Sequence, residues 1–331
     1  MYRRILVPLD GSPLSEQSIP YALILAKGLK SEINLFRAFS SVPSEVGDPT
    51  NVEEMVYIFG PLPAGYRYPS SRPSSKKEFK SSIIASMRNS LKDYLEERGQ
   101  PLKAEGVNVS SQIYEGEAAT AIIEEGQRQP NTLIVMSTHG RSGLTRWLLG
   151  SVATKVICGA TNPLLLIHPQ DESKAPSTPK LDSIVVPVDG STIAEQILPH
   201  VAAVAKALQL SVKLVSVVPP FAYFYTYTGT DYAPFPYMDV AKEEELLAMS
   251  YLEKTEAKLK KESVKSVEKL IVHGDPAASI VDAARDTPNS MVAMTTHGRS
   301  GVGRWFLGSV ADRVVRYSGA PVLLVRARKE E

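Results

Sequence analysis

The feature that most constrains this chain is an internal duplication. Residues 138–153 recur as residues 296–311 with only three positions changed. The early stretch Ile5-Leu-Val-Pro-Leu-Asp-Gly-Ser12 also returns, as Ile184-Val-Val-Pro-Val-Asp-Gly-Ser191. The period is far longer than that of a solenoid repeat, so the pattern indicates a duplicated domain. A chain of 331 residues is long enough to fold as two domains.

The boundary between the domains is predicted from composition. Residues 171–180 are polar, contain two prolines and show neither helical nor strand periodicity. Such a segment is typical of a linker. We therefore expect one domain over residues 1–170 and a second over residues 181–331.

Within each half, short apolar runs alternate with amphipathic stretches, which predicts strands that alternate with helices. This order favours a parallel α/β fold with helices on both faces of the sheet. The predicted strands of the first half are 5–9, 32–38, 107–114, 132–137 and 163–168, with the main helices at 13–29, 81–98 and 118–128. The predicted strands of the second half are 183–188, 212–217, 269–273, 291–295 and 321–326, with helices that include 246–262 and 277–285.

The duplicated stretch places a glycine-bearing loop between a buried strand and a helix. Glycine allows close backbone approach to a ligand, and a helix start offers unpaired N–H groups and a positive dipole end to an anion. Ser151 and Ser309 are expected to be the N-caps of these helices. The loops could also be ordinary turns, but their near-identity within one chain favours a ligand role.

Composition excludes some classes of function. The net charge of +1 gives no case for nucleic acid as a partner, and Cys158 is the only cysteine, so neither an intramolecular disulfide nor a thiolate metal cluster can form. No apolar run is long enough for a membrane span. His, Asp and Glu show no metal-ligand spacing, so we expect no intrinsic metal site. The expected location is the cytoplasm.

The two halves differ mainly after the second strand. Residues 40–77 are rich in Pro, Ser and Tyr, whereas residues 219–238 are rich in aromatic residues. Insertions of this length are usually functional or disordered. The aromatic one is expected to pack against a neighbouring domain or a ligand.

Several motifs together resemble the universal stress protein family, in its tandem-domain form. These are the strand ending Pro-x-Asp-Gly-Ser, the later Gly-x-Pro/Ala-Ala, the Ser/Thr-x-His-Gly-x9-Gly-Ser-Val loop, and the closing strands at 162–167 and 320–325. The resemblance covers nearly the whole chain. It implies two Rossmann-like (HUP-type) domains, each a five-stranded parallel sheet of order 3-2-1-4-5. It also implies that the fifth strands pair across the domains as an intramolecular pseudo-dimer, with a homodimer as an open possibility.

The resemblance further implies a site for ATP, or for AMP or ADP, in each domain, with Mg²⁺ carried by the nucleotide. Asp10 and Asp189 would contact adenine or ribose. The backbone of Ala38 and Val217 would meet the base, and Met136 and Met294 would line its pocket. The remaining site residues would surround the ligand or hold its phosphates: Pro8, Ser137, His139, Gly140, Arg141, Gly150, Ser151, Val152, Pro187, Thr295, His297, Gly298, Arg299, Gly308, Ser309 and Val310.

Some of these residues have a second interpretation. Ser137 and Thr295 stand where the nucleotide-binding motif of the family has its first glycine, and their hydroxyls could bond ribose or phosphate. Asp10 could instead cap the following helix. His139 and His297 could orient the loop rather than touch phosphate. Arg141 and Arg299 could bind phosphate bidentately or face solvent.

Three functions therefore stay open. The chain could be a nucleotide-binding regulator of a stress response that acts through conformation or association. It could be a nucleotide-free dimerising or scaffold protein, or it could be a slow ATPase or a nucleotidyl transferase. It has neither a Gly-x4-Gly-Lys-Ser/Thr loop nor a Gly-x-Ser-x-Gly elbow, and no obvious general base, so we assign no catalytic residue.

Overall fold

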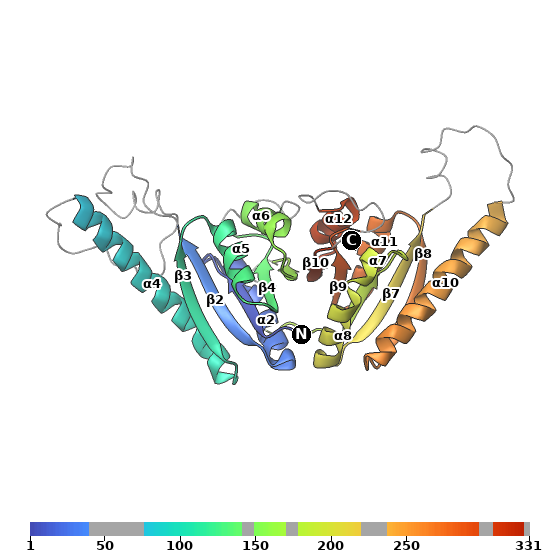
Figure 1. The fold of residues 1–331 in the computed structure, drawn as a ribbon, viewed down its shortest axis with the longest axis horizontal. Helices are drawn as coiled ribbons and strands as arrows, with labels where there is room; N and C mark the ends of the chain where they lie inside the picture. The colour runs from blue at the N-terminus through green and yellow to red at the C-terminus, as the bar shows by residue number, and fades with distance from the viewer. Residues whose placement is uncertain (40–75, 141–148, 170–177, 220–236, 298–306, 328–331) are drawn as a thin grey trace, which may run out of the picture.

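The computed structural model describes residues 1–39, 76–140, 149–169, 178–219, 237–297 and 307–327. The insertions at 40–77 and 219–238 and the predicted linker at 171–180 lie largely outside these residues. The described parts form two repeats that stand side by side (Figure 1).

The first repeat alternates strands and helices, as the apolar pattern predicts. Its elements are β1 (Arg4–Pro8), α1 (Pro13–Glu16), α2 (Ser18–Leu29), β2 (Glu32–Phe39), α4 (Lys76–Ala104), β3 (Val109–Glu115), α5 (Ala118–Arg128), β4 (Thr132–Ser137), α6 (Ser151–Gly159) and β5 (Leu164–Ile167).

The second repeat has the same order of elements. They are β6 (Ser183–Pro187), α7 (Thr192–Glu195), α8 (Leu198–Leu208), β7 (Ser211–Val218), α10 (Tyr237–Lys261), β8 (Val267–His273), α11 (Pro276–Arg285), β9 (Ser290–Thr295), α12 (Ser309–Tyr317) and β10 (Val322–Val325).

All ten strands belong to one sheet, in the order β3-β2-β1-β4-β5-β10-β9-β6-β7-β8. Each half therefore has the predicted order 3-2-1-4-5, and strands within a half are parallel. The halves meet at β5 and β10, which pair antiparallel with Leu165 opposite Leu323. The prediction that the fifth strands pair within the chain is confirmed.

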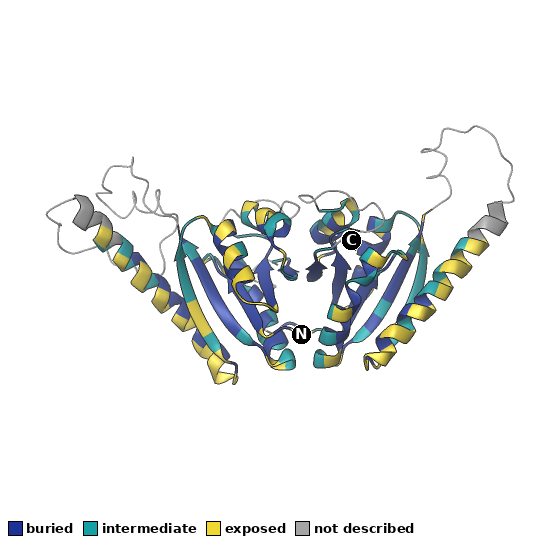
Figure 2. Ribbon diagram, viewed as in Figure 1, coloured by how far each residue is buried: buried dark blue, intermediate teal, exposed yellow. Residues whose placement is uncertain are grey.

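The central strands of the sheet are buried on both faces, as strands of parallel α/β sheets are, whereas the edge strands β3 and β8 are partly exposed. Successive residues of a strand point to opposite faces, so Ile5 belongs to the core under α2 and α4, and Leu6 belongs to the core under α5 and α6. Each core continues into the second repeat. Figure 2 shows the inner strands buried, the edge strands β3 and β8 intermediate to exposed, and the outer sides of α4 and α10 exposed. No helix within the described residues is long and apolar enough to cross a membrane.

Helices α2 and α8 also pack against each other across the junction between the repeats. Gly28 makes this contact possible, because a Cβ at that position would lie 2.3 Å from Cδ2 of Leu208. The repeats are thus joined by strand pairing and by close helix packing. This arrangement places the carboxyl ends of all parallel strands of a repeat at one edge.

Candidate functional site

Each repeat has a cavity at the carboxyl ends of its strands. The cavity of the first repeat, called pocket 1, has a volume of about 340 Å³, and that of the second, called pocket 2, about 320 Å³. Both lie where the first and fourth strands of a repeat are neighbours and the strand order reverses. Open α/β sheets bind ligands at this position.

The pockets bring together most of the residues singled out from the sequence. Pocket 1 is lined by Pro8, Asp10, Ala38, Met136, Ser137, His139, Gly140, Gly150, Ser151 and Val152. Pocket 2 is lined by Pro187, Asp189, Val217, Met294, Thr295, His297, Gly308, Ser309 and Val310. Arg141, Gly298 and Arg299 lie outside the described residues.

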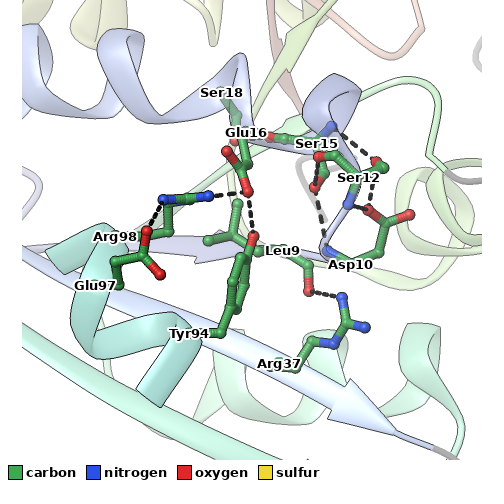
Figure 3. A network of polar contacts seen from close by, with 10 residues as sticks. All are labelled: Leu9, Asp10, Ser12, Ser15, Glu16, Ser18, Arg37, Tyr94, Glu97 and Arg98. Atoms are coloured by element: carbon green, nitrogen blue, oxygen red, sulfur yellow. Dashed lines mark hydrogen bonds and ion pairs between the residues drawn. The ribbon is translucent and has the colours of Figure 1, made fainter. Parts of the chain in front are cut away.

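Asp10 has both a structural contact and a position at the pocket. Its Oδ1 accepts hydrogen bonds from the backbone N–H of Ser12 at 2.9 Å and from the Ser12 hydroxyl at 2.6 Å (Figure 3). Its Oδ2 faces the loop after β4, since a Cβ on Gly140 would lie 2.2 Å from it. Asp189 repeats the first contact with Ser191, at 3.0 and 2.6 Å.

The two aspartates therefore hold the turn after the first strand rather than the helix directly. Ser12 is the N-cap of α1 and accepts a bond from the N–H of Ser15 at 3.2 Å. The carboxylate fixes Ser12, Ser12 fixes the helix, and the second oxygen lies at the pocket. The interpretations of Asp10 as a structural residue and as a ligand contact are compatible.

The hydroxyls of Ser137 and Thr295 serve the loop itself. Ser137 Oγ donates to the carbonyl of His139 at 2.7 Å and accepts from its N–H at 3.3 Å. Thr295 Oγ1 donates to the carbonyl of His297, also at 2.7 Å. A hydroxyl here thus closes the turn where the nucleotide-binding motif has a glycine, and its proton is used within the protein.

His139 and His297 are also tied to the loop. His139 Nδ1 lies 2.9 Å from Thr138 Oγ1, and His297 Nδ1 lies 3.2 Å from Thr296 Oγ1. Thr138 is itself fully buried, and its N–H donates to the carbonyl of Ile167 at 2.9 Å. These contacts favour the role in which the imidazole orients the loop.

The expected caps of α6 and α12 are replaced by their neighbours. Gly150 and Gly308 are the N-cap residues, and Ser151 and Ser309 already belong to the helix. The reason is a bond from the Gly150 N–H to the carbonyl of Thr138 at 2.9 Å, which pins the cap to the loop. A Cβ on Gly150 would lie 3.1 Å from that carbonyl oxygen.

This arrangement leaves an open helix end at each pocket. Neither Gly150 nor Gly308 provides a side-chain cap, and the first N–H groups of a helix have no partner within it. Ser151, Val152 and Ala153 line pocket 1. The start of α6, with its positive dipole end, therefore suits an oxyanion.

Several lining residues of pocket 1 were not predicted from the sequence, among them Phe36, Arg37, Met87, Leu91 and Ile122. Arg37 and Phe36 come from the end of β2, Met87 and Leu91 from α4, and Ile122 from α5. The one sequence signal was the arginine within the otherwise apolar end of the β2 run, Leu35-Phe-Arg-Ala-Phe39. The α4 residues had only a helical periodicity, which says nothing of a pocket.

The residues present fit a nucleotide. The cavities combine an apolar wall with a carboxylate, a glycine that permits close approach and an open helix end, which is the composition of small-molecule sites. The described residues contain no cluster of three or more His, Cys, Asp or Glu that could hold a metal ion.

A duplicated Rossmann-like sheet with an open helix end at each switch point defines a tandem α/β protein. The chain belongs to the universal stress protein family, whose model matches residues 67–168 and 180–326.

Relatives are similar over part or nearly all of the chain. Universal stress protein Rv2005c of Mycobacterium tuberculosis is 26% identical over 59% of this chain, and the match spans only 61% of that protein. Rv2623 of the same organism is 23% identical over 97% of this chain and 96% of its own length. The crystal structure of a universal stress protein from Archaeoglobus fulgidus superposes with a TM-score of 0.61 and 19% identity, and it covers 98% of each chain.

Proposed function

We propose that each repeat binds one adenine nucleotide, ATP or its di- or monophosphate, and that the protein regulates a stress response through the resulting change in conformation or association. The observation that carries the proposal is a pair of cavities, each lined by a carboxylate and by the open start of a helix. In pocket 1 the carboxylate of Asp10 also faces Gly140 of the loop.

The proposed contacts follow the chemistry of the lining residues. Asp10 and Asp189 would accept hydrogen bonds from ribose hydroxyls or the adenine amino group. Met136 and Met294 would pack on the base, next to the backbone of Ala38 and Val217. The helix starts at Ser151 and Ser309 would donate N–H bonds to phosphate. Bound Mg²⁺ would neutralise part of the phosphate charge.

No catalytic residue is proposed. Among the described residues of pocket 1, the carboxylate Oδ1 of Asp10 is held by Ser12, and the His139 imidazole is held by Thr138. Neither contact supports a general base directed at water. This favours the regulator over the slow ATPase.

The proposal also includes the organisation and setting of the chain. The domain boundaries 1–170 and 181–331, with a linker at 171–180, are supported by the second family match, which begins at residue 180. Limited proteolysis should cut first within 171–180 and release two fragments. The proposed location is the cytoplasm.

The test is to identify and titrate the ligand. The full chain is purified, denatured, and the released small molecules are analysed by mass spectrometry. The stripped protein is then titrated with ATP, ADP and AMP by calorimetry. We expect adenine nucleotide in the extract and micromolar binding at up to two sites. An empty extract with neither binding heat nor thermal shift would refute the proposal and favour a scaffold.

Phosphate release separates the regulator from the slow ATPase. Steady release from ATP that disappears in the Gly140→Val/Gly308→Val double variant would establish hydrolysis at the pockets. Binding without release above the blank would leave the regulator.

A further inference from the structure

The two pockets differ by one buried cation. Arg37, at the end of β2, lines pocket 1 and is 4% exposed. Its Nη1 donates to the carbonyl of Leu9 at 3.1 Å, and the guanidinium lies against the turn after Asp10, 3.3 Å from where a Cβ on Gly11 would be (Figure 3). The second repeat has Ser216 at the corresponding position, and it also lines its pocket.

Of the two carboxylates near pocket 1, Glu16 has another cation as its partner, and Asp10 has Arg37 as the nearest cation from the strand ends. Glu16 is paired with Arg98, at 3.0 Å, and accepts a hydrogen bond from the Tyr94 hydroxyl at 2.8 Å. Arg98 also pairs with Glu97 at 2.9 Å, so the carboxylates of Glu16 and Glu97 share one guanidinium. Asp10 and Arg37 are the remaining charged groups from the ends of β1 and β2, and together they are neutral.

Pocket 2 has the same carboxylates but one cation fewer. Glu195 is paired with Lys258 at 2.6 Å, which matches the Glu16–Arg98 pair. Asp189 lies at the pocket as Asp10 does, and Ser216 brings no charge. The lining of pocket 2 therefore lacks the buried cation that Arg37 supplies to pocket 1.

Two equivalent tyrosines experience this difference. Burial raises the pKa of Tyr94, the hydrogen bond and charge of Glu16 raise it further, and the charge of Arg37 opposes them. Burial also raises the pKa of Tyr251, to about 12, and there Glu195 and Asp189 both add negative charge. The charge of Arg37 lowers the pKa of the tyrosine in the first repeat, whereas the charge of Asp189 raises the pKa of the equivalent tyrosine in the second.

The rims of the pockets differ in the same direction. Arg88 of α4 lies over the ring of Phe39, a wall of pocket 1, and pairs with Glu115 at 2.9 Å. The corresponding residue of α10 is Glu245, 4.0 Å from His273. An imidazole carries charge only when it is protonated, whereas a guanidinium always does.

We propose that pocket 1 selects the more highly phosphorylated nucleotide and that Arg37 is the residue that determines this specificity, whereas pocket 2 discriminates little between AMP and ATP. This inference rests on the proposed function. A buried charge is screened little by salt, and a concave, low-dielectric cavity strengthens its field. Each phosphate added to the ligand therefore gains more from pocket 1 than from pocket 2.

The experiment measures each pocket by itself in the full chain. Gly308→Val silences pocket 2 and Gly140→Val silences pocket 1, and calorimetry gives the dissociation constants of AMP, ADP and ATP without added metal. We expect the dissociation constant of AMP divided by that of ATP to be about tenfold larger at pocket 1 than at pocket 2. This is the scale expected when one partly screened positive charge attracts the two further phosphate charges of ATP.

Substitutions at the two equivalent positions assign the effect. Arg37→Ser, which copies the second repeat, should reduce the ratio at pocket 1 to that of pocket 2. Arg37→Lys keeps the charge and should retain most of it. Ser216→Arg should raise the ratio at pocket 2, and this variant gives a result even if Arg37→Ser fails to fold.

The outcomes separate this inference from the function on which it rests. If no nucleotide binds at either pocket, the proposed function fails. If both pockets bind and show the same ratio, or if Arg37→Lys loses the ratio as fully as Arg37→Ser, nucleotide binding stands and the role of Arg37 is refuted.

Discussion

The two pockets share their polar turns and differ in their walls. The Asp10–Ser12 and Asp189–Ser191 contacts agree to within 0.1 Å. By contrast, α4 supplies Met87 and Leu91 to pocket 1, whereas no described residue of α10 lines pocket 2. Duplication has kept the elements that fix the loop geometry and varied those that shape and charge the cavity.

The two repeats also differ in charge within the core, away from the pockets. Arg4 and Glu125, each 3% exposed, form a buried ion pair in the first repeat, and Gln112 and Arg128 also bond Glu125. The second repeat has Ser183 and Ala283 at the positions of the pair. The equivalent core positions are therefore occupied by a charged pair in the first repeat and by small uncharged residues in the second.

The largest predicted effect comes from breaking this pair. Glu125→Ala should lower the free energy of unfolding by about 3–5 kcal/mol, because it leaves the Arg4 charge buried without its partner. The double variant Arg4→Ser/Glu125→Ala, which copies the second repeat, should recover most of the loss. Urea denaturation followed by circular dichroism measures both. If both variants lose the same free energy of unfolding, the loss comes from packing around Glu125 and not from the unpaired Arg4 charge.

The next prediction tests the shared loop. Gly140→Val should weaken nucleotide binding at pocket 1 by at least about 100-fold, or roughly 2.7 kcal/mol, since its Cβ would lie 2.2 Å from Asp10 Oδ2. Pocket 2 should be unaffected. Gly99→Ala is the matched control, because its Cβ would come no closer than 3.4 Å to Val109. Unchanged calorimetric titrations of Gly140→Val would remove the loop from the site.

Much of the fold was predictable because its signals are local or repeated. The bounds of α5 were predicted at 118–128 and are those found. By contrast, α4 was expected to end at residue 98, and it continues through Pro101 to Ala104. Leu102 explains the difference: its side chain is 2% exposed, and its carbonyl accepts from the Val107 N–H at 3.3 Å. Tertiary packing outweighs the cost of a proline here.

The site was predictable only where a motif fixes the backbone. The aspartates, the loop hydroxyls and the helix starts meet at the pockets because parallel strands end at one edge. Arg37 was missed, since periodicity cannot distinguish a strand residue that faces a cavity from one that faces solvent. Ser151 was mistaken for the cap because the bond between Gly150 and Thr138 joins two segments that the sequence does not place together.

The third prediction concerns pH and the junction between the repeats. His200 of α8 lies 2.6 Å from the Tyr2 hydroxyl, and burial lowers the pKa of its imidazole to about 4. The unfolded imidazole titrates near 6.5, so between these values the unfolded chain binds more protons. The contribution of the neutral His200 imidazole to the free energy of unfolding is therefore complete above pH 6.5 and is lost as the pH falls toward 4. About 2 kcal/mol of it is lost at pH 5.

The corresponding residue of the first repeat is Tyr21, which has no charge to gain in acid. The double variant Tyr2→Phe/His200→Phe should therefore lose about 2 kcal/mol less than the native chain between pH 7 and pH 5. Tyr2→Phe alone keeps the imidazole and should keep the acid sensitivity. If the double variant and the native chain lose the same amount in urea titrations at the two pH values, His200 is not the acid-sensitive group.

The smallest predicted effect is the difference in stability contribution between two side chains that form hydrogen bonds across the junction. His168, after β5, donates through Nε2 to the carbonyl of Val315 in the last turn of α12. Arg326, after β10, donates to the carbonyls of Cys158 and Ala160 at the end of α6, at 3.3 and 3.2 Å. Burial lowers the pKa of His168, so at pH 7 it is a neutral donor. Arg326 is always charged.

A cation at a helix carboxyl end gains from the dipole as well as from the hydrogen bond. Arg326→Gln should therefore cost about 1 kcal/mol more than His168→Gln in the free energy of unfolding at pH 7. His168→Arg should stabilise the junction by a similar amount if the guanidinium reaches Val315. Equal costs for the two glutamine variants would show that strand pairing between β5 and β10 holds the repeats together, and that the charge at this position adds nothing.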